Sequence, residues 1–129
     1  MLQVLAVMDD LLFLSRVREA ARGAGVEVRP VRQPAQLVEG VRDGGRLVLV
    51  DADSSRLPWA DALAALKAEG LLDAVPVVAF FSHAHAERAE TARAAGCDRV
   101  FPRSAFVREL PTLLAASAEQ PTQLEEPTP

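Results

Sequence analysis

Residues 46–55 read Arg-Leu-Val-Leu-Val-Asp-Ala-Asp-Ser-Ser, and this segment carries the most information about the architecture. Its four consecutive aliphatic residues, Leu47 to Val50, leave no polar side chain to face water. Such a run predicts a strand that is covered on both faces, which is typical of a central strand in a parallel sheet. The run ends at Asp51. In an open parallel sheet this places Asp51 at the carboxyl edge, where such folds bind their ligands.

Four further apolar segments alternate with helical patterns around this strand. Repeated strand–helix units predict right-handed crossovers and a parallel sheet. We expect a flavodoxin-like three-layer α/β sandwich with five strands in the order 2-1-3-4-5, because the first, third and fourth strands are the most apolar and should be central. The other predicted strands are 3–8, 26–31, 75–81 and 100–101.

The predicted helices have apolar residues at helical spacing and recognisable ends. Pro58 should be the first residue of the third helix. Pro111 fits the last helix only within its first turn, because deeper in the helix it would remove a hydrogen bond. The helices are expected to begin near Asp10, at Pro34, at Pro58, at Ala84, and at Ser104 or Glu109.

Composition limits the class of protein. The chain has 129 residues, enough for one domain, which we place at residues 1–116, with a polar, proline-rich and disordered tail at 117–129. Its net charge of −4 argues against a broad nucleic-acid interface. No apolar run approaches the roughly 18 residues of a membrane span. The single cysteine, Cys97, excludes an internal disulfide, fits a reducing compartment and is expected to be buried. Together, the charge, the lack of a long apolar run and the single cysteine predict a cytoplasmic protein with no membrane or nucleic-acid partner.

Three acids should converge at the carboxyl edge of the sheet. Asp9 and Asp10 follow the first strand and Asp51 ends the third, on either side of the switch in strand order. Gathered carboxylates repel one another, and a hard cation such as Mg²⁺ relieves this. An aspartate at such a place can also take up a phosphoryl group. The simpler alternative is that these acids, and Asp53 just beyond the third strand, only cap the helix or the loop that follows them.

Several segments resemble the receiver domain of bacterial two-component response regulators. They are Asp9-Asp10 after the first strand, Asp51 after the third, residues 76–84 (Pro-Val-Val-Ala-Phe-Phe-Ser-His-Ala), and residues 96–101 (Gly-Cys-Asp-Arg-Val-Phe) before the last helix. The resemblance covers roughly residues 2–116. It implies that Asp51 is the phosphoacceptor and that Asp9, Asp10 and Asp51 hold Mg²⁺. Met8 stands where the family has its first acid, unless Asp9 and Asp10 serve as the pair.

The switch positions of the family are altered in this chain. Receiver domains end their fourth strand with Thr or Ser and their fifth with Lys; here Phe81 stands at the hydroxyl position, with Ser82 beside it, and Arg103 stands at the lysine. A phenyl ring donates no hydrogen bond, and an arginine is a planar fork rather than a compact charge. Losing one preorganised donor typically costs about 3 kcal/mol. We therefore expect impaired phosphotransfer and weak Mg²⁺ binding.

Two arrangements are left open by these substitutions. Arg103 either lies in solvent or reaches Asp51 and forms a standing ion pair that imitates the switched state. Phe81, Phe101 and Phe106 either form a packed aromatic corner that replaces the moving hydroxyl, or they are core residues only.

The resulting hypothesis is a stand-alone, atypical receiver-like module, a pseudo-receiver, that is not an enzyme and acts by binding proteins. The partner would be a histidine kinase or a downstream signalling protein, met through the fourth helix, fifth strand and fifth helix, a surface that could also pair two copies. One alternative is an ordinary response regulator in a phosphorelay, phosphorylated on Asp51. Another is a small-molecule-binding flavodoxin-like module, although no glycine-rich phosphate loop follows any strand.

Overall fold

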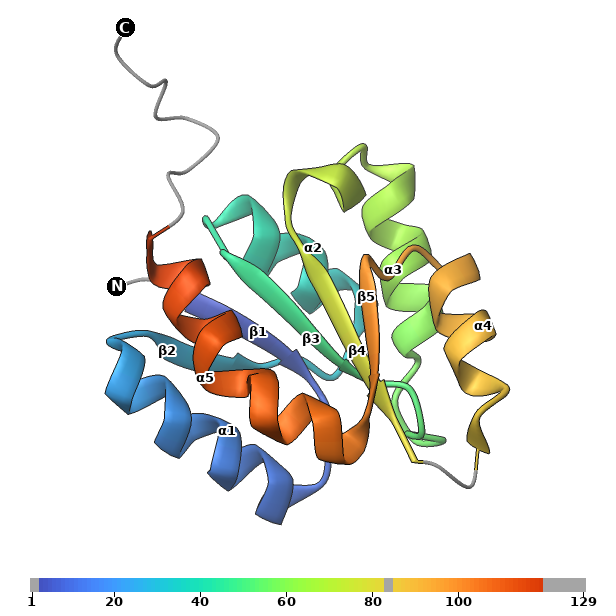
Figure 1. Ribbon diagram of the computed structural model, residues 1–129. Coiled ribbons are helices and arrows are strands. Elements are labelled where there is room, and N and C mark those ends of the chain that lie inside the picture. Colours follow the sequence, from blue (N-terminus) through green and yellow to red (C-terminus); the bar gives the residue numbers. More distant parts are fainter. Residues whose placement is uncertain (1–2, 83–84, 120–129) are drawn as a thin grey trace, which may run out of the picture.

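Five parallel strands form one sheet in the order β2-β1-β3-β4-β5, as predicted (Figure 1). The computed structural model describes residues 3–82 and 85–119. The strands are β1 Gln3–Val7, β2 Glu27–Pro30, β3 Leu47–Asp51, β4 Val77–Phe81 and β5 Arg99–Pro102. The helices are α1 Leu11–Ala24, α2 Pro34–Arg42, α3 Trp59–Ala68, α4 Arg88–Ala94 and α5 Arg103–Glu119, with a short 3₁₀ helix, η1, at Leu72–Ala74. The expected α/β class and parallel sheet are confirmed.

The helices lie in two layers, with α1 and α5 on one face of the sheet and α2, α3 and α4 on the other (Figure 1). Successive residues of a strand point to opposite faces. Val4 and Ala6 of β1 therefore pack toward α1 and α5, whereas Leu5 and Val7 pack toward α2 and α3. Every residue of β3 is buried, which confirms that it is a central strand. Its carboxyl end, at Asp51, consequently opens between the two helical layers.

Helix α1 begins and ends at the predicted residues. The Asp10 carboxylate accepts a hydrogen bond from the backbone N–H of Phe13 at 3.1 Å and so caps the first turn. Gly25, with φ of +73°, takes the left-handed conformation that ends the helix. The cap fixes Asp10 at the carboxyl edge of the sheet, close to the end of β1.

Helix α5 is longer than expected and contains Pro111 in its interior. The prediction that Pro111 lies in a first turn is wrong. Pro111 is exposed, and the carbonyl that loses its partner belongs to Val107, which is also exposed on the solvent side. Helix hydrogen bonds are already longest on the solvent side, so a missing one costs least there. On the opposite side, Phe106, Leu110 and Leu114 are buried and hold the helix against the sheet.

The boundary of the tail also differs from the expectation. Residues 117–119 continue α5, and the Ser117 hydroxyl is buried and donates to the Leu114 carbonyl at 2.7 Å. The rest of the expected tail, 120–129, lies outside the described residues. Over residues 3–82 and 85–119, no helix is long and apolar enough to cross a bilayer.

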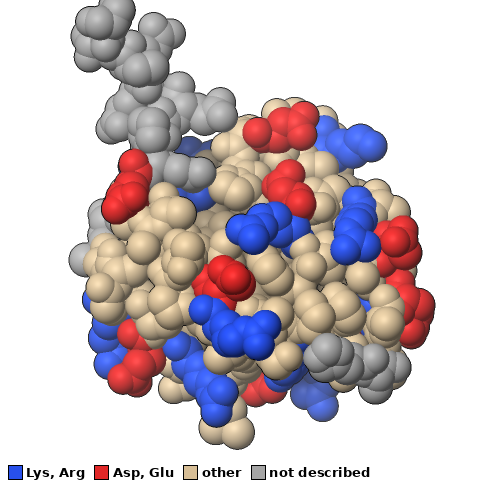
Figure 2. Space-filling model, in the orientation of Figure 1, with Lys and Arg blue, Asp and Glu red and all other residues tan. Residues whose placement is uncertain are grey.

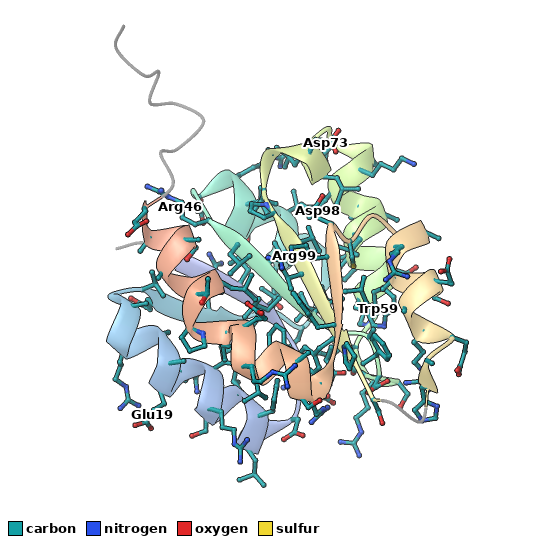
Figure 3. The ribbon with its side chains drawn as sticks, in the orientation of Figure 1. Glu19, Arg46, Trp59, Asp73, Asp98 and Arg99 are labelled. Atoms are coloured by element: carbon teal, nitrogen blue, oxygen red, sulfur yellow. The ribbon has the colours of Figure 1, made fainter. Side chains whose placement is uncertain are left out.

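Three smaller features complete the fold. Pro58 is the N-cap of α3 rather than its first helical residue, and the following Trp59 packs into the core beneath α3 (Figure 3). Helix α4 begins at Arg88, later than predicted, and Ala84, its expected start, lies outside the described residues. Cys97 is buried, as expected, and burial, with a smaller contribution from the Asp98 charge, raises the pKa of its thiol to about 12.

Candidate functional site

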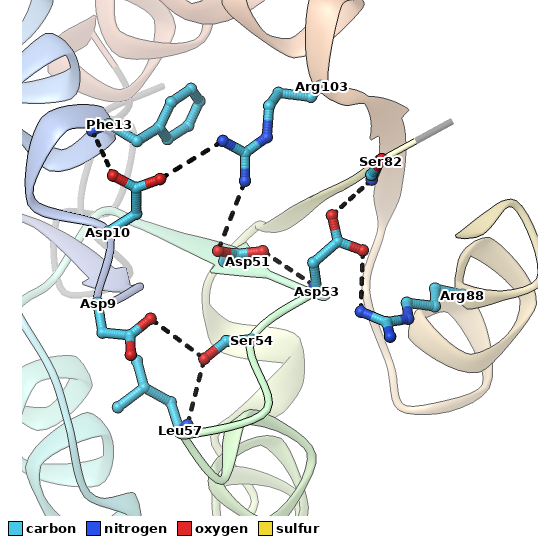
Figure 4. Close-up of polar contacts among 10 residues, drawn as sticks. All are labelled: Asp9, Asp10, Phe13, Asp51, Asp53, Ser54, Leu57, Ser82, Arg88 and Arg103. Atoms are coloured by element: carbon cyan, nitrogen blue, oxygen red, sulfur yellow. Dashed lines mark hydrogen bonds and ion pairs between the residues drawn. The ribbon is translucent and has the colours of Figure 1, made fainter. Parts of the chain in front are cut away.

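The carboxyl edge of the sheet brings together side chains from four strand ends (Figure 4). Asp9 and Asp10 follow β1, Asp51 ends β3, Ser82 follows β4, and Arg103 begins α5 directly after β5. Arg103 lies between two of the acids: Nη1 is 3.7 Å from Asp10 Oδ2 and Nη2 is 3.8 Å from Asp51 Oδ2. The acids predicted to converge therefore do share one neighbourhood, with a guanidinium among them.

Asp51 is 4% exposed, and both of its carboxylate oxygens face partners from its own chain. Oδ1 accepts a hydrogen bond from the backbone N–H of Asp53 at 2.9 Å, and Oδ2 faces Arg103. Burial raises the pKa of Asp51 above its usual 3.8, and it outweighs the lowering by the Asp53 N–H and the Arg103 charge. The negative charges of Asp53 and Asp9 raise that pKa further. Ionised Asp51 is thus an unfavourable buried charge.

Replacing Asp51 by asparagine is expected to raise the free energy of unfolding at pH 7 by about 1 kcal/mol, because a neutral amide costs less to bury than a charge. The raised pKa means that the folded state keeps a proton that the unfolded chain has lost. Protonated Asp51 therefore stabilises the folded state. This contribution is complete below the usual pKa of 3.8 and is lost as the pH rises through the pKa that Asp51 has in the folded state. Urea unfolding at several pH values should show the gain from asparagine shrinking as the pH falls toward 3.8.

A matched control for this measurement is Asp73→Asn, which changes an exposed carboxylate outside the site. It should leave stability nearly unchanged at pH 7. If Asp51→Asn were destabilising at pH 7, or if its effect did not vary with pH, Asp51 would not be the strained buried charge described above.

Arg103 also covers the aromatic floor of the site. Its guanidinium carbon lies 4.8 Å from the centre of the Phe13 ring and 5.2 Å from that of Phe80. Cations over aromatic faces are attracted by the ring quadrupole, and the planar guanidinium suits this geometry better than an ammonium. The contact with Asp51 that the sequence left open is therefore present, in a setting adapted to arginine.

The aromatic cluster of the site is not the corner of Phe81, Phe101 and Phe106 that was one of two alternatives left open by the sequence. Phe13, Phe80 and Phe106 pack together, with ring centres 4.6–5.9 Å apart. Phe81 points to the opposite face of the sheet, among the core residues under α2, α3 and α4, so it cannot join Phe106 in one corner. Phe101 is partly buried on the Phe106 side. Of the two alternatives left open, the corner is excluded because neighbouring strand residues alternate between faces, and Phe81 and Phe106 are core residues, as the other alternative had it.

Asp9 makes a separate contact with the loop after β3. The Ser54 hydroxyl donates to Asp9 Oδ1 at 3.3 Å and accepts from the backbone N–H of Leu57 at 3.2 Å. This pair ties the end of β1 to the loop that leads into α3 (Figure 4). Asp9 is therefore oriented toward the loop rather than toward Asp10.

Asp53 is a central residue of the site that sequence reasoning treated only as a loop cap. Its Oδ2 accepts a hydrogen bond from the Ser82 backbone N–H at 2.6 Å, and its Oδ1 lies 3.1 Å from Arg88 Nη1. Its side chain is 16% exposed. The one signal in the sequence was the Asp51-x-Asp53 spacing, which places a second acid just beyond the end of a buried strand.

The three acids predicted to hold Mg²⁺ face different partners in the structure. Among the described residues, no group of three His, Cys, Asp or Glu side chains is placed to hold a metal ion. Asp10 caps α1 and faces Arg103, Asp9 faces Ser54, and Asp51 faces Arg103 and Asp53. A three-carboxylate Mg²⁺ site therefore stays a prediction, at a place where the Arg103 guanidinium already compensates part of the negative charge.

A surface cleft of about 670 Å³ opens beside the acids, between the beginnings of α1 and α5. Two of the residues that line it are exposed apolar side chains, Leu12 (84%) and Val107 (36%). Exposed apolar groups gathered at one place mark surfaces that contact other molecules. The residues lining the cleft are Asp10, Leu12, Phe13, Arg16, Ser82, Arg103, Ser104 and Val107.

Charges on the face that carries α5 and β5 are mixed. Basic and acidic side chains are interspersed there, and no continuous basic area is visible on this face (Figure 2). Nucleic-acid interfaces usually present such an area. This face therefore gives no support to nucleic-acid binding.

Comparison with known proteins gives matches in structure but none in sequence: no protein-family model and no curated protein matches this chain. The receiver domain of the sensor histidine kinase PA1611 from Pseudomonas aeruginosa PAO1, solved with a magnesium ion in its active-site cleft, is 21% identical, with a TM-score of 0.74 over 92% of this chain and 98% of that one. A CheY-like receiver domain protein from Methanospirillum hungatei JF-1 is 17% identical, with a TM-score of 0.69 over 92% and 94%. The phosphorylated cyanobacterial phytochrome response regulator RcpA is 18% identical, with a TM-score of 0.66 over 88% and 89%. These likenesses establish the receiver-domain fold.

Proposed function

We propose that this chain, which has the fold of a response-regulator receiver domain, is a receiver-like signalling module that acts by binding a protein partner and in which phosphotransfer to Asp51 is impaired. The observation that carries the proposal is the state of Asp51. Its two oxygens already face the Asp53 N–H and the Arg103 guanidinium. Asp51 itself therefore engages the donors that an incoming phosphoryl group would need.

The chemistry of phosphotransfer supports this reading. A carboxylate that attacks phosphorus must be ionised and reachable, whereas Asp51 is 4% exposed and burial raises its pKa. Phe81, which replaces the family's hydroxyl, is buried on the far face of the sheet and can donate no hydrogen bond. Arg103, in place of the family's lysine, is engaged with two acids and two rings. With two donors altered at about 3 kcal/mol each, phosphotransfer is strongly disfavoured.

Protein binding is supported by the exposed apolar side chains of Leu12 and Val107, which line the cleft. We propose a histidine kinase or a downstream signalling protein as the partner, within two-component signalling in the cytoplasm. The surface of α4, β5 and α5, where Arg99 lies over the Phe101 ring at 4.8 Å, is proposed for pairing with a second copy. The module is a regulator rather than an enzyme.

The second candidate function is phosphorylation of Asp51 as in an ordinary receiver. It is favoured by the position of Asp51 at the end of β3 with the Asp9 carboxylate nearby. The solved relatives with the same fold include a phosphorylated response regulator and a receiver domain holding magnesium. Under this alternative, Asp9 and Asp51 would bind Mg²⁺ weakly, since one or two carboxylates suffice when the ion keeps its waters.

Beryllofluoride with Mg²⁺, an analogue of the phosphorylated aspartate, distinguishes the two functions. Trp59 is the only tryptophan and begins the helix after the site, so its fluorescence reports on this region. We expect no saturable fluorescence change in the native chain and no phosphorylated species by mass spectrometry after treatment with acetyl phosphate. Asp51→Asn is the control. A saturable change in the native chain that Asp51→Asn abolishes would establish the second function instead.

A further inference from the structure

We propose that the chain contains an oxyanion-binding site, formed by the Ser82 backbone N–H and the Arg88 guanidinium, and that its own Asp53 carboxylate occupies it. When that carboxylate is removed, an inorganic oxyanion such as sulfate or phosphate takes its place. The proposal goes beyond the proposed function, because it concerns anion binding beside Asp51 and requires no reaction at Asp51.

Two donors from different segments converge on the Asp53 carboxylate (Figure 4). The Ser82 N–H, at the end of β4, is 2.6 Å from Oδ2, and Arg88 Nη1, from α4, is 3.1 Å from Oδ1. Each oxygen therefore has its own donor. Short contacts of this kind are charge-assisted hydrogen bonds, which are stronger than bonds between neutral groups.

The donor set is of the kind that binds oxyanions. A guanidinium presents N–H donors in a fixed geometry that matches carboxylates and phosphates. A backbone N–H pointing at the same place donates a hydrogen bond to the anion from a second direction. The Asp53 side chain is 16% exposed and that of Arg88 is 34% exposed, so the pair lies near the surface but is partly shielded from water. An anion from solvent can reach this place once the carboxylate is gone.

The internal carboxylate has two effects on its surroundings. It joins the loop after β3 to the end of β4 and to α4, since its partners Ser82 and Arg88 lie 29 and 35 residues further along the chain. Its negative charge also contributes to raising the pKa of Asp51. While Asp53 is in place, a second anion is repelled and finds the two donors already used. Asp53 thus acts as a built-in occupant that keeps the site closed to external anions.

Thermal unfolding in sulfate, in phosphate and in chloride at equal ionic strength, without Mg²⁺, tests the proposal. For Asp53→Ala we expect sulfate and phosphate to raise the melting temperature saturably, by about 5 °C at ten times the dissociation constant, relative to chloride. The native chain should show no such difference between anions. Asp53→Ser, which also shortens the side chain, is made in parallel in case Asp53→Ala does not fold.

Two further variants assign the effect to the donors. Asp9→Ala removes a negative charge from the same site but leaves Asp53 on its partners, so it should gain no anion-dependent rise. The double variant Asp53→Ala/Arg88→Gln should lose the rise that Asp53→Ala gains. If neither Asp53 variant responded to sulfate or phosphate, or if Asp9→Ala responded equally, the proposal would be overturned. Neither result bears on phosphotransfer at Asp51, which the beryllofluoride measurement tests separately.

Discussion

Phe80→Ala is expected to lower the free energy of unfolding by about 4 kcal/mol, the typical cost of emptying a fully buried aromatic position. The Phe80 ring is 0% exposed and packs against Phe13 and Phe106 at 4.7 and 4.6 Å between ring centres. Both neighbours belong to helices, α1 and α5, so the cavity would loosen the helical layer from the sheet. Urea unfolding followed by circular dichroism measures the loss.

A suitable control for this variant is Phe101→Ala, on the neighbouring strand β5. Phe101 is only partly buried, so its removal should cost less than half as much. Because Phe80 also lies beneath Arg103, its loss should reduce the stacking of that arginine as well. A cost for Phe80→Ala no greater than that for Phe101→Ala would show that the aromatic cluster is not the anchor of α1 and α5.

Arg103→Ala is expected to destabilise the chain by about 2 kcal/mol at pH 7, because it leaves the buried Asp51 carboxylate without its compensating charge. The figure is below that of a fully buried pair, since the Arg103 side chain is 38% exposed and its distances to Asp10 and Asp51 are 3.7 and 3.8 Å. Loss of the contacts between Arg103 and the rings of Phe13 and Phe80 contributes the rest of this destabilisation. Denaturant unfolding at neutral pH gives the value.

A double-mutant cycle isolates the ion pair from the stacking. In an Asp51→Asn background, Arg103→Ala should cost about 1 kcal/mol less than in the native chain, since no buried charge is left to compensate. Arg103→Lys keeps the charge but loses the planar contact with the rings, so it should fall between the native chain and Arg103→Ala. Equal costs of Arg103→Ala in both backgrounds would mean that Asp51 and Arg103 are not coupled.

The fold could be predicted from local patterns because the decisive signals are local. An aliphatic run such as Leu47–Val50 excludes a solvent-facing strand, and the spacing of apolar residues between Asp10 and Gly25 defines a helix with its caps. Repeated strand–helix units then permit few topologies. The meeting of Asp9, Asp10 and Asp51 follows from topology alone, and it was predicted.

The detail of the site could not be predicted because it depends on contacts between distant segments. Asp53 bonds to residues 29 and 35 positions further on, and nothing in its local sequence names them. Whether Phe80 or Phe81 faces Phe106 depends on a one-residue register, which a wholly apolar strand does not reveal. The position of Pro111 was predicted wrongly because the rule that confines proline to the first turn of a helix takes no account of packing. In α5, burial of Phe106 and Leu110 outweighs the loss of one backbone hydrogen bond on the solvent side.

The buried thiol of Cys97 has a practical consequence for the study of the partner. With its pKa raised to about 12, almost none of it is thiolate at neutral pH, and maleimide reagents attack the thiolate. A fluorophore or spin label can therefore be attached to one cysteine introduced at the exposed Leu12 while Cys97 stays in place. Such a label would sit at the rim of the cleft and respond directly when another protein covers it.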